Sequence, residues 1–178
     1  LRTLDEVLLH VWFIKQAEPQ NHPTLVFFQG NGGNMGWRVP FLATLFRELG
    51  VNIIILSYRG YGNSEGSPTE NGLYEDARCL FEYIEDLTTI DRSQVYVYGR
   101  SLGGAVAIFA THQFKLENVT IQGLIVENTF TSTKDMANVF FPSLPQVCSR
   151  AVLRIKFPSL KRIESIKYPI LFISSDND

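Results

Sequence analysis

The chain has 178 residues, of which 45% are hydrophobic and 19% charged, a composition typical of a globular domain with a sizeable core. Sixteen basic and eighteen acidic residues leave a net charge of -2, and neither sign forms a long run, which argues against a nucleic-acid partner. No apolar run approaches the roughly 18 residues that span a bilayer, so the chain as it stands is expected to be soluble.

Strands and helices are expected to alternate along the chain. Apolar or β-branched runs predict strands at 7–14, 24–30, 51–58, 94–99, 121–128 and 168–175, and apolar residues at helical spacing predict helices at 37–49, 73–84, 102–114 and 132–140. Parallel strands need crossover helices, so this alternation predicts an α/β fold: a mostly parallel sheet with helices on both faces. No linker interrupts it, which predicts a single domain over residues 1–178.

The segment VYVYGRSLGGAVA, residues 95–107, places Ser101 between a strand and a helix. A nucleophile elbow requires a serine at such a turn, in strained backbone geometry and with tiny neighbours that let other backbone pass close by. Gly99 and Gly103 meet this requirement. The alternative is a serine that caps a helix in a glycine-containing turn.

An acyl-transfer site also needs two N–H groups aimed at the position of the oxyanion. The backbone N–H of Leu102 is the first candidate, because it follows the serine. The glycine-rich segment FFQGNGGN, residues 27–34, supplies the second, and Asn31 is the candidate donor. A dinucleotide cradle is disfavoured there, because Met35 stands where a third glycine is needed and the next strand ends in Ser57 rather than an acid.

Four segments together resemble the alpha/beta-hydrolase family, and closely the branch that contains alpha/beta-hydrolase domain-containing protein 13 and fungal bud-emergence relatives. They are FFQGNGGN, SYRGYGNSEGSP followed by ENGLYEDARC, VYVYGRSLGGAVA, and IVENTFTS at 125–132. The resemblance implies a serine hydrolase that acts on carboxylic ester or thioester bonds and needs no metal or organic cofactor. Its substrate would be a small or lipid-like acyl compound or an acylated protein. Gln29 and Ser57 depart from the family, which usually has histidine and aspartate there.

Two further expectations about the site come from the resemblance. The closing segment YPILFISSDND resembles the strand and loop that present the triad acid and places the family aspartate on Asp178, with Asp176 as the close alternative. A plain acidic loop is the competing interpretation. Members of the family often carry an N-terminal membrane anchor, which implies membrane association. The chain begins at Leu1 rather than methionine, so its localisation stays open.

The catalytic base is not found among the three histidines. In this fold the histidine follows the acid, but His10, His22 and His112 all precede Asp178. His112 lies eleven residues along the helix from Ser101, roughly 16 Å away. We therefore expect a last strand, a histidine loop and a closing helix beyond Asp178, and we expect residues 1–178 alone to be nearly inactive.

Residues 133–160 are expected to form a region that covers the site. Within it, Phe140, Phe141, Leu144 and Val147 either line an acyl pocket or belong to ordinary packing. The cysteines, Cys79 and Cys148, form no CxxC pair and suggest neither a disulfide framework nor a zinc site. The rival to the hydrolase hypothesis is a non-catalytic subunit or scaffold with the same fold.

Overall fold

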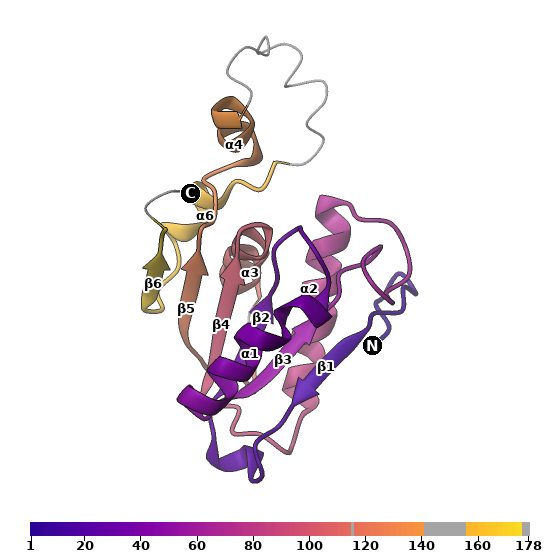
Figure 1. Ribbon diagram of the computed structural model, residues 1–178, viewed down its shortest axis with the longest axis vertical. Helices are drawn as coiled ribbons and strands as arrows, with labels where there is room; N and C mark the ends of the chain where they lie inside the picture. Colours follow the sequence, from indigo (N-terminus) through magenta and orange to yellow (C-terminus); the bar gives the residue numbers. More distant parts are fainter. Residues whose placement is uncertain (115, 141–155, 176–178) are drawn as a thin grey trace.

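The computed structural model describes residues 1–114, 116–140 and 156–175, and its framework is one six-stranded sheet (Figure 1). The strand order is β1-β3-β2-β4-β5-β6. The strands are β1 (Val11–Ile14), β2 (Thr24–Phe28), β3 (Asn52–Leu56), β4 (Val95–Arg100), β5 (Ile121–Glu127) and β6 (Ile170–Ile173). Only β1 is antiparallel to its neighbour, and the other pairs are parallel. The predicted α/β fold with a mostly parallel sheet is confirmed.

Helices cover both faces of the sheet. They are α1 (Met35–Leu49), α2 (Glu70–Asp86), α3 (Leu102–Gln113), α4 (Thr133–Phe140) and α6 (Ser159–Ile163). Alternate residues of β2 point to opposite faces: Phe28 packs in one cluster with residues of α2 and α3, and Phe27 packs in the other with Leu42 of α1. Because both faces are buried, β2 and β3 are apolar at nearly every position.

Several element bounds differ from the sequence-based prediction, two of them for a clear local reason, and one helix is additional. The strand expected at 7–14 begins only at Val11, because residues 1–9 fold back on themselves, with Leu1 and Leu9 exchanging backbone hydrogen bonds. Helix α1 starts two residues earlier than expected, since the Asn34 side chain accepts a hydrogen bond from the Trp37 N–H and caps it. The short helix α6 was not predicted.

The carboxyl ends of β2, β4 and β5 meet at one edge of the sheet, where the segments with site candidates emerge. Helix α4 lies beyond the end of β5, at the top of Figure 1. In open α/β sheets this edge is where ligands bind, so the fold brings the loop with Asn31, the turn with Ser101 and helix α4 to the same edge.

Candidate active site

Ser101 occupies a sharp turn between β4 and α3. Its backbone angles are φ 53° and ψ −117°, a conformation that L-residues rarely adopt. Its N–H donates to the Glu127 carbonyl at 2.9 Å, which ties the turn to the end of β5. The side chain does not cap α3, and within the described residues its hydroxyl has no hydrogen-bond partner. The helix-capping alternative is therefore not what this serine does.

Gly99 and Gly103 allow the backbone on both sides of Ser101 to come into close contact. A Cβ on Gly103 would lie 1.9 Å from the Phe28 carbonyl oxygen, and a Cβ on Gly99 would lie 2.3 Å from the Gly103 carbonyl oxygen. Backbone atoms cannot move aside as a flexible side chain does. Each glycine is thus required by packing, as predicted for an elbow.

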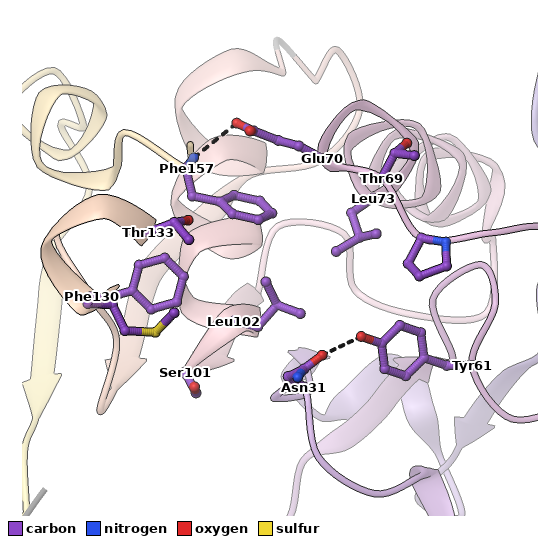
Figure 2. A pocket seen from close by; sticks show the side chains of 12 residues that line it. Asn31, Tyr61, Thr69, Glu70, Leu73, Ser101, Leu102, Phe130, Thr133 and Phe157 are labelled. Carbon is purple, nitrogen blue, oxygen red and sulfur yellow. Dashed lines mark hydrogen bonds between the residues drawn. The ribbon is translucent and has the colours of Figure 1, made fainter. Parts of the chain in front are cut away.

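The two proposed oxyanion donors lie at the same pocket as the serine. Leu102 is the first residue of α3, and the N–H of a first helical residue has no acceptor within its own helix. Asn31 lies in the loop between β2 and α1, and its Oδ1 accepts a hydrogen bond from the Tyr61 hydroxyl (Figure 2). In the described part of the chain neither backbone N–H is taken by another group, so both remain available to a bound oxygen.

The loop that carries Asn31 is attached to the end of β3. The Tyr58 hydroxyl donates to the Gln29 carbonyl at 3.0 Å, and the Gln29 amide donates to the Leu56 carbonyl at 3.4 Å. Complete burial raises the pKa of Tyr58 well above its ordinary value, so this hydroxyl stays protonated and remains a donor. Gln29, one of the two departures from the family pattern, therefore holds the loop through its amide group.

An apolar pocket of about 380 Å³ opens in front of Ser101 (Figure 2). Ser101, Leu102 and Asn31 contribute to its wall. The others are Tyr61, Pro68, Thr69, Glu70, Leu73, Phe130, Thr133, Met136 and Phe157. Sequence reasoning did not single out these nine, although several lie in segments that carry the family resemblance. Phe141, Leu144, Val147 and the Phe140 side chain lie outside the described residues.

The proposed acids, Asp178 and Asp176, also lie outside the described residues, but the chain that leads to them is described. Asn128, at the end of β5, donates through its amide to the Ser175 hydroxyl and accepts from the Ser175 N–H, both at 2.9 Å. Its own N–H donates to the Ile173 carbonyl at 2.9 Å. These bonds hold the chain after β6 at the sheet edge where Ser101 lies.

Each of the three histidines is engaged away from the pocket. His10 Nε2 accepts from the Trp12 ring N–H at 3.1 Å. His22 Nδ1 lies 2.7 Å from the Gly50 carbonyl, and His112 Nδ1 lies 2.7 Å from the Ser165 hydroxyl, on the far end of α3. None of them lines the pocket of Ser101. That the base lies after the acid in the chain stays a prediction.

Comparison with known proteins identifies the family. The family model described as "alpha/beta hydrolase fold" matches residues 23–177, so the chain belongs to the alpha/beta hydrolase fold family. A solved esterase, Pf2001 of Pyrococcus furiosus, shares the fold with a TM-score of 0.70 at 21% identity; the match covers 96% of this chain and 65% of the esterase.

Three curated relatives extend the comparison. Protein bem46 of Schizosaccharomyces pombe is 42% identical over all of this chain and 59% of its own length. An uncharacterized membrane protein of Saccharomyces cerevisiae, YNL320W, is 37% identical over 81% of this chain and 49% of its own length. Lysophosphatidylserine lipase ABHD12 of Danio rerio is 28% identical over 94% of this chain and 46% of its own length. The chain therefore spans about half to three fifths of these relatives.

Two kinds of feature are absent from the described residues. No helix among them has the length and apolar character needed to cross a bilayer. Within the same residues, no group of three or more His, Cys, Asp or Glu side chains is arranged to hold a metal ion.

Proposed function

We propose that this chain forms the nucleophile-bearing part of a serine hydrolase that cleaves carboxylic ester or thioester bonds. The observation that carries the proposal is Ser101 itself: a non-glycine residue in a strained turn that lines an apolar pocket and whose hydroxyl makes no helix-cap hydrogen bond. A serine with only a structural role gains nothing from this geometry. The lipase name of the Danio rerio relative supports an acyl ester as the substrate.

The proposed reaction follows the acyl-enzyme route. The Ser101 oxygen attacks the acyl carbonyl carbon while a histidine that follows the acid in the chain takes its proton, and Asp178 orients that histidine. The N–H groups of Leu102 and Asn31 stabilise the oxyanion. Collapse of the tetrahedral intermediate expels the alcohol or thiol, which receives the proton from the histidine. Water then releases the acid from Ser101 by the same steps.

The apolar pocket supports a lipid-like acyl substrate or an acylated protein. Its volume and its phenylalanine and leucine side chains suit a hydrocarbon chain rather than a charged one. The membrane protein among the relatives supports an enzyme that works close to a membrane.

Hydrolysis of p-nitrophenyl esters by the full-length protein tests the proposal. Ser101→Ala is expected to lower kcat by about 10⁴-fold or more, because only binding and the oxyanion hole remain. Ser165→Ala is the matched control, since it removes the serine hydroxyl that does contact a histidine, His112. Equal loss in both variants, or full activity in Ser101→Ala, would contradict the proposed role. A wild-type protein without hydrolase activity would favour the non-catalytic subunit.

A further inference from the structure

The carboxylate of Glu70 reaches across the pocket to a distant part of the chain. Glu70 is the first residue of α2. Its Oε2 accepts a hydrogen bond from the Lys156 N–H at 2.5 Å, and its Oε1 accepts from the Phe157 N–H at 3.1 Å (Figure 2). The Tyr74 hydroxyl also donates to Oε1, at 2.6 Å. The carboxylate thus accepts hydrogen bonds from three donors, two of which belong to residues 86 and 87 positions away in sequence.

Lys156 and Phe157 belong to a pair of chain segments that we call the neck, residues 131–133 and 156–160. Its two segments are bonded to each other: the Thr133 N–H donates to the Lys156 carbonyl at 3.1 Å, and the Leu160 N–H donates to the Thr131 carbonyl at 3.2 Å. The neck therefore behaves as one unit, and Glu70 fixes it to α2.

Two residues of the neck line the pocket, Thr133 and Phe157, and Phe157 contributes the aromatic ring. Its backbone has φ 38°, a left-handed conformation that a bulky residue keeps only where its surroundings hold it there. Its ring is 1% exposed and packs edge-on against Tyr74 at 5.6 Å and against Phe130 at 6.2 Å between ring centroids. Figure 2 shows the ring facing the cavity opposite Leu102. The hydrogen bond from its N–H to Glu70 is one of the contacts that hold this conformation.

We infer that Glu70 is a positioning residue that places Phe157 in the pocket wall and thereby sets the preference of the site for long acyl chains. The inference rests on the proposed function and adds the residue that determines chain-length selectivity. Without the carboxylate, two backbone N–H groups lose a charged acceptor, and the backbone at Phe157 is free to leave its strained conformation. A long chain then loses its contact with the ring, whereas an acetyl group, which extends only a short way from Ser101, does not reach it.

Glu70→Gln is the decisive variant because it keeps the shape of the side chain. The amide retains one acceptor oxygen and turns an N–H₂ group toward one of the two backbone donors. We expect KM for p-nitrophenyl decanoate to rise about tenfold with kcat unchanged. The lost contact binds the substrate and the transition state equally, and the loss of such a contact raises KM alone. The constants for p-nitrophenyl acetate should stay within twofold of the wild type. A general loss of folding would instead lower the rates for both esters.

Two controls make the comparison specific. Glu75→Gln makes the same change on α2 at a partly exposed residue that pairs with Arg78 and does not line the pocket, and it should leave both esters unaffected. Phe157→Ala should reproduce the loss with decanoate, and adding Glu70→Gln to it should have no further effect, because the two residues act through one contact. Additive losses would overturn the inference. If Glu70→Gln does not fold, Tyr74→Phe removes a donor to the same carboxylate and should shift chain preference in the same direction.

Binding of decanoic acid, measured by calorimetry, separates this inference from the proposed hydrolase activity. Glu70→Gln should weaken decanoate binding about tenfold whether or not the protein hydrolyses esters. A wild type that binds decanoate but cleaves neither ester refutes the hydrolase proposal. The role of Glu70 is then decided by the ratio of the decanoate dissociation constants of Glu70→Gln and the wild type. A wild type that does not bind decanoate, or a variant that binds it as tightly as the wild type, overturns the inference.

Discussion

The elbow around Ser101 and the neck around Phe157 face each other across one pocket but are held in place by different means. At the elbow, backbone passes so close to backbone that a Cβ on Gly103 would lie 1.9 Å from a carbonyl oxygen. At the neck, the backbone N–H groups of two residues end on one carboxylate, that of Glu70. Close contact between backbone atoms permits a single arrangement at the elbow, whereas the hydrogen bonds that hold the neck can be broken. Ser101, the proposed nucleophile, thus lies on the rigid side of the pocket, and Phe157, proposed to set chain length, lies on the adjustable side.

The largest effect is expected at the rigid side, from Gly103→Ala. The added methyl group meets the backbone of Phe28, so we expect the free energy of unfolding to fall by more than about 3 kcal/mol, measured by urea denaturation. Gly32→Ala is the control from the oxyanion loop, because a Cβ there has no atom within 4 Å. If the free energies of unfolding of Gly103→Ala and Gly32→Ala differed by less than about 1 kcal/mol, the elbow would not be held by close packing.

A smaller effect of opposite sign is expected at Ser101. Glycine adopts φ 53° and ψ −117° without the steric penalty of an L side chain. Ser101→Gly should therefore be more stable than Ser101→Ala by about 1 kcal/mol in the same denaturation assay, although both variants lack the nucleophile. Equal stabilities would show that the turn stores no strain.

The smallest effect is expected at the neck, from Thr133→Val. The Thr133 hydroxyl is buried and has no hydrogen-bond partner among the described residues, so its removal should change the free energy of unfolding by less than about 0.5 kcal/mol. Thr111→Val is the matched control, because that buried hydroxyl donates to the Ala107 carbonyl at 2.8 Å and its loss should cost about 1 kcal/mol. A larger cost at Thr133 than at Thr111 would reveal a partner that the described residues do not contain.

The contrast between the elbow and the neck also explains how much of the fold and the site could be predicted from the sequence. The requirement for glycine at positions 99 and 103 lies within a few residues of Ser101, so a local pattern was enough to place the elbow. The mostly parallel sheet also followed, because parallel strands that alternate with helices need crossover connections. The strand order was not predicted and came from the structure. The bond between Glu70 and Phe157 joins residues 87 positions apart, and nothing in either local pattern points to the other. The contact of Glu70 with the pocket wall therefore emerged only from the structure.

The errors in the predicted strands and helices have local physical reasons. The segment expected as a strand at 24–30 ends at Phe28, because Gln29 and Gly30 already belong to the turn that leads to the oxyanion loop. The short helix α6 is one turn after a proline, too short for a periodic pattern to indicate. The acid on Asp178 and the acyl-pocket residues at 140–147 remain predictions.

Labelling with a fluorophosphonate, followed by peptide mapping in a mass spectrometer, tests the central claim most directly. The full-length protein should carry one adduct, on the peptide that contains Ser101, and Ser101→Ala should carry none. An adduct on a different serine, or an unlabelled wild type, would contradict the assignment of Ser101 as the nucleophile.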